Sequence, residues 1–370
     1  MSLDEIRKKI DAIDRELAPL IKKRMECSLE VARIKKAENL PIYHAGREQE
    51  ILDRVSRDAG EEYGVYVSSV YRNMMAVSRA LQTDTLFKNG SFAEKVMSYP
   101  KDMTYKKVIC QGAPGAFSHA AARSMFNELT PEFLLSFEDV FKVCEADETA
   151  VGILPVENST AGSVNSVYDL ILKYKLCIVK AKRVDVSQNL LTVGDESQVK
   201  VVYSHPHALK QCEKYIKEHN ITAMQFENTA LAAKYVAELN DPAIAAIGST
   251  EAAEMYGLRV GATSIQDNKD NITRFIAVSK KPFIAPDSNT VSLAFTIPHE
   301  KGSLYSMLGR FADCGLNLTK IESRPLGHGF EYKFYLDFSG NIKDARTLSL
   351  LSSLEQTLSF FVFLGNYNEK

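Results

Sequence analysis

Apolar residues in the first part of the chain recur at the spacing of amphipathic helices. Between residues 3 and 37 they fall three or four positions apart, and only Pro19 breaks the pattern. Residues 47–59 and 67–82 repeat this spacing, and no strand pattern occurs before the polar connector at 83–106. We predict an all-α first domain, with a kink at Pro19 because an interior proline removes one backbone hydrogen bond.

The first predicted helix is much longer than the two that follow it. Its short partners cannot cover the whole apolar stripe, and a stripe left in water favours association. We therefore expect a second copy of the chain to pack against this helix, in a homodimer or a tetramer.

After residue 107 the pattern changes to short apolar runs that alternate with amphipathic stretches. VICQG precedes AFSHAAARSMF, and AVGILPV precedes SVNSVYDLILKY, which is the order of an α/β domain. Residues 136–159 and 227–250 are faintly similar, and each reads as a helix, an acidic turn and a buried strand. This repeat predicts two similar lobes, with a ligand held in the crevice beyond the carboxyl ends of the strands.

The last part of the chain carries a third pattern. From residue 290 onward the predicted order is strand, helix, strand, strand, helix, strand. This βαββαβ order is typical of a ferredoxin-like α+β module. The predicted domains are therefore residues 1–90, 107–283 and 290–370.

Composition narrows the possible classes of function. Apolar residues make up 45% of the chain, charged residues 25%, and the formal net charge is −2, so no strong field favours nucleic acid or an anionic membrane. No apolar run reaches the roughly 18 to 20 residues that span a bilayer, and the first residues lack the apolar region of a signal peptide. We expect a cytoplasmic protein that acts on small molecules.

The cysteines point to no metal site. All six are widely scattered, with no Cys-x-x-Cys or Cys/His spacing that would bind zinc. We expect reduced thiols, most of them in the core.

Cations on the first predicted helix have a spacing that bears on function. Arg24 and Lys35 are eleven residues apart, about three turns, and project from nearly one line. Arg7 lies about 25 Å from Arg24 and roughly a quarter turn around the helix, so in a shared site it would serve the partner chain's copy. A solvated cationic face is the simpler explanation of the spacing alone.

The segment PIYHAGRE, and Ser78 and Gln82 one turn apart, change this interpretation. With the long first helix they closely resemble the all-helical chorismate mutase family, an intertwined helical dimer, over residues 1 to about 90. The resemblance implies that Arg24, Arg47 and the second subunit's Arg7 bind the two carboxylates of chorismate. Lys35 and Gln82 would donate hydrogen bonds to its ether oxygen, Glu48 would bind its ring hydroxyl, and Ser78 would assist binding. His44 stands where the related bacterial pattern often has Asp.

Cationic donors suit this reaction. Chorismate becomes prephenate by a pericyclic rearrangement, which needs no nucleophile and no proton transfer. An enzyme can therefore act only by fixing the compact conformer and by stabilising charge that develops on the ether oxygen.

Polar clusters follow several predicted strands of the middle domain. Each of GAPGAFSHAAA, VENST and VYSHPHALKQC could by itself be a helix cap. In order with NITRF they closely resemble prephenate dehydratase over residues 107 to about 282, which implies a two-lobed, periplasmic-binding-protein-like fold. By this resemblance Thr273 is the main catalytic residue, and the cleft is lined by Asn158, Ser159, Thr160, Ser204, His205, Gln211, Arg274 and Phe275, with Glu157 nearby.

The implied reaction removes water and carbon dioxide from prephenate and leaves aromatic phenylpyruvate. Thr273 is then a hydrogen-bond donor or proton relay for the departing oxygen, because a threonine hydroxyl is a weak acid. Arg274 would pair with a substrate carboxylate, and the alternative is a salt bridge that braces the loop. Phe275 could keep water away.

KGSLYSML and GLNLTKIESRP resemble the amino-acid-binding ACT module over about residues 290 to 367. The resemblance implies phenylalanine binding between paired modules, and feedback inhibition if phenylalanine favours a less active dehydratase. The implied contacts are Gly302, Ser303, Leu304, Asn317, Leu318 and Thr319, with Glu322, Ser323 and Arg324 of the Glu-Ser-Arg-Pro sequence.

Taken together, these resemblances imply a bifunctional chorismate mutase/prephenate dehydratase of phenylalanine biosynthesis that needs no cofactor and no metal. Two alternatives stay open. The same chemistry could act on arogenate, and no residue pattern decides this. A non-catalytic amino-acid sensor is the other alternative, against which the presence of Thr273 and of the Arg24, Lys35, Arg47 and Glu48 set argues.

Overall fold

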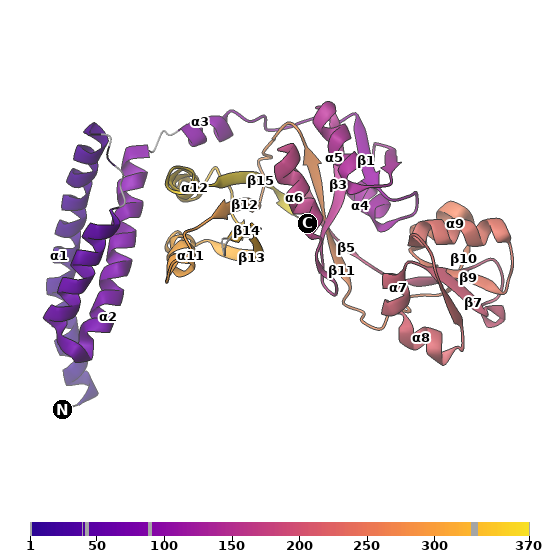
Figure 1. Cartoon of the computed structure of the whole chain (residues 1–370), viewed down its shortest axis with the longest axis horizontal. Coiled ribbons are helices and arrows are strands. Elements are labelled where there is room, and N and C mark those ends of the chain that lie inside the picture. Colours follow the sequence, from indigo (N-terminus) through magenta and orange to yellow (C-terminus); the bar gives the residue numbers. More distant parts are fainter. Residues whose placement is uncertain (1, 39, 41–43, 88–90, 327–331, 370) are drawn as a thin grey trace. The chain divides into compact units, whose positions relative to one another are not determined.

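The computed structural model describes residues 2–38, 40, 44–87, 91–326 and 332–369 (Figure 1). The chain forms two units. Unit 1 combines Met1–Tyr99 with Val291–Phe363, and unit 2 combines Pro100–Thr290 with Leu364–Lys370. The last strand of the chain therefore begins in one unit and ends in the other.

The N-terminal part of unit 1 is all-α, as predicted. Helix α1 (Leu3–Ala37) begins with a capping box between Ser2 and Glu5 and continues through Pro19 without a break in its helical assignment. Helix α2 (Ala45–Phe87) is interrupted at Gly60, whose φ of 76° is accessible to glycine at little cost. The two shorter helices predicted from the sequence are thus the two parts of α2.

The apolar stripe of α1 lies largely in water in the single chain. Ile13 is 63% exposed, and among the described side chains of this helix only Ala32 is buried. The exposed members of the stripe are Leu3, Ile6, Ile10, Ile13, Leu17 and Leu20. The prediction that the shorter helices leave this stripe uncovered is confirmed.

The C-terminal part of unit 1 has the predicted βαββαβ order. Its elements are β12 (Thr290–Thr296), α11 (Ser303–Asp313), β13 (Asn317–Pro325), β14 (Tyr332–Ser339), α12 (Ala345–Thr357) and β15 (Phe361–Glu369). The strands lie in the order β13-β14-β12-β15, so β13 is at an edge. Arg310 on α11 donates to Ser353 and Thr357 on α12, which ties the two helices together.

The connector predicted at 83–106 is more ordered than its polar composition indicates. Helix α2 extends to Phe87, and a short helix, α3 (Ser91–Met97), follows. Phe92 of α3 is buried and meets the rings of Phe361 and Phe363 edge-on, with centroids 5.9 and 5.7 Å away. The prediction of a plain polar connector was wrong, because the Phe92 ring of α3 is buried against β15, a strand far along the chain.

Unit 2 contains two α/β lobes, as predicted (Figure 1). In the first lobe β1, β2 and β3 are parallel, and β11 runs antiparallel to β3 and β5. The order is β5-β11-β3-β1-β2, and the end of β15 adds to β5 in parallel. The strands are β1 (Lys107–Gln111), β2 (Pro131–Leu134), β3 (Ala150–Asn158), β4 (Gly162–Ser163), β5 (Cys177–Asp185) and β11 (Ile272–Ser279), with helices α4 (Phe117–Met125), α5 (Phe137–Ala146) and α6 (Asn165–Tyr174).

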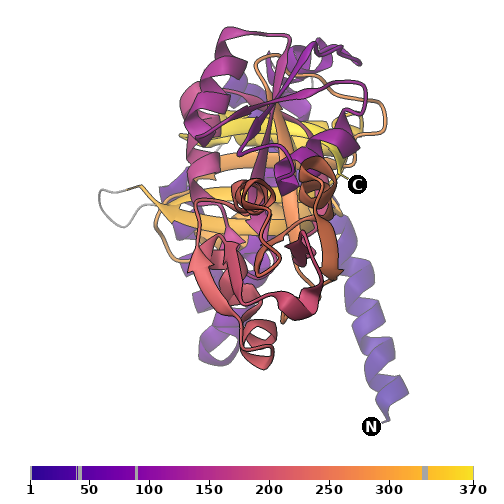
Figure 2. The ribbon, with the colours of Figure 1, turned by 90° about the vertical axis from the view of Figure 1, so that its right-hand side faces the viewer.

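The second lobe faces the viewer in Figure 2 and is built on the strand order β10-β6-β9-β7-β8. Its strands are β6 (Asn189–Thr192), β7 (Val201–Ser204), β8 (Thr222–Gln225), β9 (Ile244–Gly248) and β10 (Arg259–Ala262), and its helices are α7 (Pro206–Gln211), α8 (Glu213–Glu218), α9 (Thr229–Leu239) and α10 (Thr250–Tyr256). The similar segments of the sequence are α5 with β3 in one lobe and α9 with β9 in the other.

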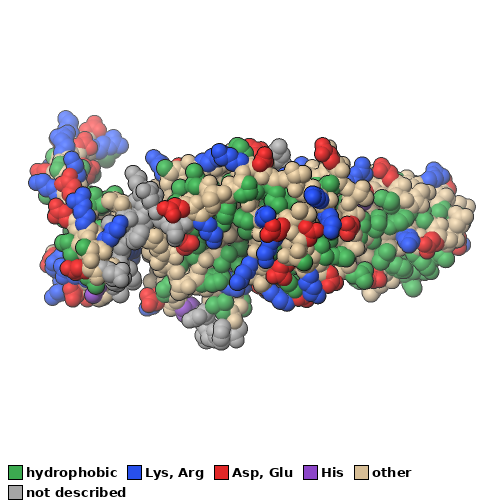
Figure 3. Space-filling view, turned by 90° about the horizontal axis from the view of Figure 1, so that it is seen from above, with side chains coloured by type: hydrophobic (Ala, Val, Ile, Leu, Met, Phe, Trp, Pro, Cys, Tyr) green, Lys and Arg blue, Asp and Glu red, His purple; other side chains and the backbone are tan. Residues whose placement is uncertain are grey.

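The described part of the chain shows no membrane-spanning helix and no arrangement of metal ligands. None of its helices is both long and apolar enough to cross a bilayer, and none of its His, Cys, Asp and Glu side chains form a group of three or more that could hold a metal ion. Burial raises the pKa of the Cys110, Cys144 and Cys212 thiols to about 12, so these three are inert core residues. Basic and acidic side chains are interspersed on the face seen in Figure 3.

Two candidate active sites

The first candidate site lies between α1 and α2. Arg24 Nη1 donates to Ser78 Oγ at 2.8 Å, and the Ser78 hydroxyl donates to the Met74 carbonyl at 2.9 Å. Gln82 lies one turn beyond Ser78 and is buried, yet its Oε1 has no hydrogen-bond partner among the described residues. A buried amide oxygen without a partner is costly, which favours a ligand at this position.

The start of α2 supplies the next group of predicted residues. Glu48 accepts a hydrogen bond from Arg79, while Arg47 Nη1 pairs with Glu50 at 2.9 Å. His44 Nδ1 accepts from the backbone N–H of Arg47 at 3.1 Å, so this nitrogen serves to cap the helix. The preceding Pro-Ile-Tyr of PIYHAGRE lies outside the described residues. Arg79, which the sequence interpretation missed, is the partner that orients Glu48.

Arg7 is not near Arg24 in the same chain. Its guanidinium pairs with Asp4 one turn earlier, at 3.6 Å and in solvent. The two arginines are separated by about 25 Å along one continuous helix. Lys35 lies in the last turn of that helix. The described contacts therefore bring Arg24 and Ser78 together, with Gln82 one turn away. Arg7 of the same chain does not belong to this group.

The second candidate site is organised by Asn158, at the end of β3. Its Oδ1 accepts from the backbone N–H groups of Thr160 and Ala161 at 3.0 and 2.8 Å. Backbone N–H groups can only donate, so the amide orientation is determined and Nδ2 must face the other way. There Nδ2 donates to Thr273 Oγ1 at 2.8 Å and to Asn271 Oδ1 at 2.7 Å.

Thr273 is therefore held as a hydrogen-bond acceptor. It is the second residue of β11, lies opposite Asn158, and is only 8% exposed. Because its oxygen accepts from Asn158, its own proton can be donated, and among the described residues the hydroxyl donates to no protein atom. The arrangement presents a threonine O–H whose oxygen is already polarised by an amide donor.

Gln211 of α7 connects the second lobe to this group. Its Nε2 donates to Thr160 Oγ1 at 3.1 Å, and its Oε1 accepts from Asn271 at 3.2 Å and from Gln188 at 3.3 Å. Asn271 and Gln188 were missed from the sequence. Both are buried amides, and Asn271 is the first residue of the quoted NITRF, although no role was predicted for it.

Ser159 also joins the two sequence motifs. Its hydroxyl donates to the Asp270 carbonyl at 2.8 Å and accepts from the Ile272 backbone at 2.9 Å. The structure thus gathers Asn158, Ser159, Thr160, Gln211 and Thr273 around one hydrogen-bonded network, across the ends of β3, α7 and β11.

Other predicted cleft residues take structural positions. Ser204 is fully buried and donates to the Ile247 carbonyl at 2.7 Å, which ties β7 to β9. His205 caps α7 by accepting from His207 N–H, and burial, followed by the nearby His207, lowers the pKa of His205. Phe275 packs in the core of the first lobe with Val108 and Ala277. Their contacts with a ligand stay predictions.

Arg274 is directed toward the end of the chain. Its Nη2 donates to the Tyr367 hydroxyl at 2.8 Å and to Glu369 Oε2 at 2.8 Å. Glu157 is its cross-strand neighbour on β3. Of the two interpretations of this arginine, a substrate clamp or a bracing salt bridge, its present contacts match the second.

The Gly-Ala-Pro-Gly loop links the two lobes on another side. Ser249, which caps α10, donates to the Gly115 carbonyl at 2.5 Å, and Tyr256 donates to the Pro114 carbonyl at 2.8 Å. A Cβ at Gly115 would lie 2.8 Å from Ala252 Cα, and the φ of 88° there also favours glycine. Gly115, the second glycine of the loop, therefore allows close contact between the lobes.

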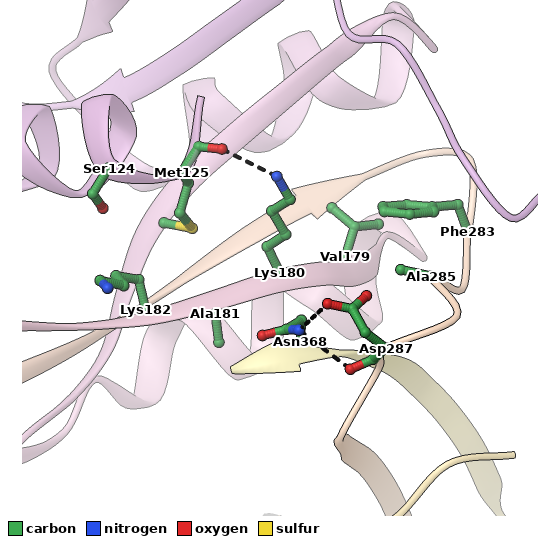
Figure 4. A pocket seen from close by; sticks show the side chains of 10 residues that line it. All are labelled: Ser124, Met125, Val179, Lys180, Ala181, Lys182, Phe283, Ala285, Asp287 and Asn368. Atoms are coloured by element: carbon green, nitrogen blue, oxygen red, sulfur yellow. Dashed lines mark hydrogen bonds between the residues drawn. The ribbon is translucent and has the colours of Figure 1, made fainter. Parts of the chain in front are cut away.

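A cavity of about 320 Å³ lies elsewhere in unit 2 (Figure 4). Lys180 reaches across one side to the Met125 carbonyl at 3.1 Å, and Asn368 donates to Asp287. The lining is Ser124, Met125, Val179, Lys180, Ala181, Lys182, Phe283, Ala285, Asp287 and Asn368. This lining contains none of the predicted site residues, so the cavity is separate from the group around Thr273.

The residues predicted to bind an amino acid fall at two ends of α11. Gly302 caps its start with a φ of 85°, followed by Ser303 and Leu304. Asn317, Leu318 and Thr319 open β13 after its other end. Glu322, Ser323 and Arg324 continue along β13, where Lys320 pairs with Glu322 at 3.3 Å.

Comparison with known families covers both candidate sites. Residues 6–83 match the chorismate mutase type II family, and residues 108–283 match the prephenate dehydratase family. Among solved structures, prephenate dehydratase from Arthrobacter aurescens in complex with L-Phe is 30% identical, covers 70% of this chain and 89% of its own, and superposes with a TM-score of 0.64. GqqA, described as a novel type of quorum quenching acylase, is 27% identical over 72% of this chain and 98% of its own, with a TM-score of 0.65.

Relatives match part or nearly all of the chain. Arogenate dehydratase 1 from Petunia hybrida is 36% identical over 70% of this chain and 66% of its own. The bifunctional chorismate mutase/prephenate dehydratase of Aquifex aeolicus is 32% identical over 99% of this chain and 97% of its own. With two catalytic regions in one chain and two matching candidate sites, this protein belongs to the family of bifunctional chorismate mutase/prephenate dehydratases.

Proposed function

We propose that Thr273 donates the hydrogen bond that helps hydroxide leave prephenate. The observation that carries this role is the hydrogen bond from Asn158 Nδ2 to Thr273 Oγ1. A donor to the threonine oxygen makes its O–H a better donor in turn, and it leaves the proton directed away from Asn158. In the dehydratase reaction, the ring C–O bond breaks with its electron pair on oxygen, and the departing hydroxide becomes water by taking a proton from solvent.

Decarboxylation completes the reaction without another catalytic group. The bond between the ring and its carboxylate breaks, carbon dioxide leaves, and the bonding electrons enter the ring, which becomes aromatic. The protein's task is to hold the carboxylate perpendicular to the ring and to stabilise the departing oxygen. The cluster of Asn158, Ser159, Thr160 and Gln211 supports such orientation, because it joins strand ends of both lobes through side-chain hydrogen bonds.

For the mutase site we propose that Arg24 and Arg47 bind chorismate together with Arg7 of a second subunit. One chain places Arg24 beside Ser78 while its own Arg7 is about five turns away. Lys35 and Gln82 would then donate to the ether oxygen, where negative charge develops. Glu48, oriented by Arg79, would bind the ring hydroxyl.

The exposed stripe of α1 supports a dimer in which these helices pair. Replacing Ile13, which is 63% exposed, by Glu should place a charge in that interface. We expect Ile13→Glu to shift the protein toward monomer in sedimentation velocity and to lower mutase activity by at least about tenfold, because Arg7 would no longer reach the partner's site.

A matched control is Leu239→Glu, at an apolar side chain of unit 2 that is 43% exposed. It should leave both the sedimentation coefficient and the mutase rate unchanged. An Ile13→Glu protein that keeps its assembly and full mutase activity would contradict the paired-helix arrangement.

We further propose that phenylalanine binds between two C-terminal modules. Gly302 and Asn317 flank α11, whose eleven residues span about 16 Å, so one small amino acid cannot contact both ends within a single module. A paired module would complete the site, and the edge position of β13 supports such pairing.

Phenylalanine should lower the dehydratase rate of the full-length chain, and Asn317→Ala should require more phenylalanine for the same inhibition. Isothermal titration would measure binding, and phenylpyruvate absorbance would measure the rate. Phenylalanine that binds tightly but changes neither the dehydratase rate nor the affinity for prephenate would contradict feedback inhibition.

Substrate preference is tested by comparing prephenate with arogenate. We propose prephenate as the main substrate, supported by the Aquifex aeolicus relative and by the mutase region that produces prephenate in the same chain. The similarity to an arogenate dehydratase keeps arogenate as the second candidate. A larger kcat/KM for arogenate, with phenylalanine as product, would reverse this order, and inactivity on both would favour the sensor alternative.

A further inference from the structure

Glu369, near the end of the chain, joins two arginines of the first lobe of unit 2. Its Oε2 accepts from Arg274 Nη2 at 2.8 Å, and its Oε1 accepts from Arg183 Nε at 2.9 Å. The side chains of Arg274 and Glu369 are only 9% and 11% exposed. Each carboxylate oxygen therefore accepts from one cation. Water screens the buried pair with Arg274 weakly, whereas the Arg183 side chain is 63% exposed and its pair is screened more strongly.

Strand register explains why a carboxylate is needed there. Arg274 on β11 lies directly opposite Arg183 on β5. Glu369 lies on β15, which pairs with the other edge of β5, and its partner residue there is Ala181. Two like charges opposite each other on neighbouring strands are destabilising. Glu369 offsets that repulsion, and the buried Tyr367 hydroxyl accepts a further hydrogen bond from Arg274.

The ion pair adjoins the catalytic threonine along β11. Successive side chains of a strand point to opposite faces, so Arg274 is anchored on one side while Thr273 meets Asn158 on the other. The register between β11 and β3 shifts between Arg274 and Phe275, and such a bulge disrupts the ladder locally. The side-chain anchor therefore holds the strand where its backbone pairing is irregular.

We infer that Glu369 is a positioning residue for the dehydratase reaction: through Arg274 it holds β11 so that the Thr273 hydroxyl stays aligned with Asn158. The inference rests on the proposed role of Thr273 and assigns Arg274 to bracing instead of substrate binding. It also makes the last strand of the chain, which begins at Phe361 in the C-terminal module, part of the dehydratase machinery.

The test is Glu369→Gln in the full-length chain. Gln keeps the size of the side chain but removes the negative charge that Arg274 and Arg183 contact. We expect kcat for dehydration of added prephenate to fall about 10- to 100-fold, because small displacements of a catalytic group cost that much. KM for prephenate should change less than about threefold, since the inferred role gives Glu369 and Arg274 no contact with the substrate, and the mutase rate should be unchanged.

Two companion variants separate positioning from general loss of structure. Glu148→Gln makes the same chemical change in an exposed pair with Lys281 of the same unit and should leave kcat unchanged. Glu369→Asp restores the charge and should recover part of the lost kcat. Tyr367→Phe removes only the hydroxyl that accepts from Arg274 and should lower kcat severalfold with KM unchanged. This variant tests the inference if Glu369→Gln does not fold.

Three results would overturn the inference: a normal kcat in Glu369→Gln, a change in KM with kcat preserved, or an equal loss in Glu148→Gln. With an unfolded Glu369→Gln, a normal kcat in Tyr367→Phe would overturn it too. Failure of the proposed function itself looks different, because the wild-type chain would then not convert prephenate at all.

Discussion

Thr273→Ala should stop phenylpyruvate formation while chorismate is still consumed, so that prephenate accumulates. Removing one preorganised donor to a developing charge typically costs about 10²- to 10³-fold in kcat, and Thr273 supplies the only donor proposed for the departing oxygen. One assay can follow all three compounds when chorismate is supplied to the full-length protein. The mutase rate should match that of the wild type.

Thr273→Ser is the matched control. It keeps the hydroxyl beside Asn158 and removes only a methyl group, so most of the dehydratase rate should remain. Phenylpyruvate production by Thr273→Ala at the wild-type rate would show that another group assists the departing oxygen. Loss of both activities in a folded variant would argue against two separate sites.

Lys35→Ala should have the opposite result. Chorismate should persist because the ether oxygen loses a cationic donor, and we expect mutase kcat to fall about 10²- to 10³-fold. Dehydration of added prephenate should continue at the wild-type rate, because Lys35 and the Thr273 group belong to different units. Chorismate absorbance and phenylpyruvate absorbance, measured separately, test the two parts.

Lys36→Ala provides the comparison for that change. It removes the same charge from the next position of α1, about 100° around the helix, and should leave the mutase rate within about twofold. If Lys36→Ala and Lys35→Ala lowered the rate equally, the general positive charge of the helix end would matter more than a directed donor.

Sequence patterns predicted the elements well where the relevant contacts are local. Helix α1 was predicted over residues 3–37 because its apolar spacing repeats every turn, and the βαββαβ order followed from runs within one module. Helix α3 was missed, because its segment is only seven residues long and its buried Phe92 contacts β15, far along the chain.

For the candidate sites, family resemblance identified residues that hydrophobic periodicity could not. It selected Asn158 and Thr273, which are 115 positions apart and which the structure joins by one hydrogen bond. It did not select Asn271 or Gln188, which act as amide partners inside the network. It also left the direction of Arg274 open, since the partner of that arginine lies 95 positions later.

By itself, the sequence determined the helical, α/β and βαββαβ parts of the chain, their order, and the family motifs that carry the two reactions. Periodicity and motifs depend on residues a few positions apart, so they can be read along the chain. Only the tertiary structure decided which hydrogen atoms face which acceptors around Thr273, and that Arg274 pairs with Glu369. Those facts depend on strands that meet through long-range pairing and register, which no local pattern encodes.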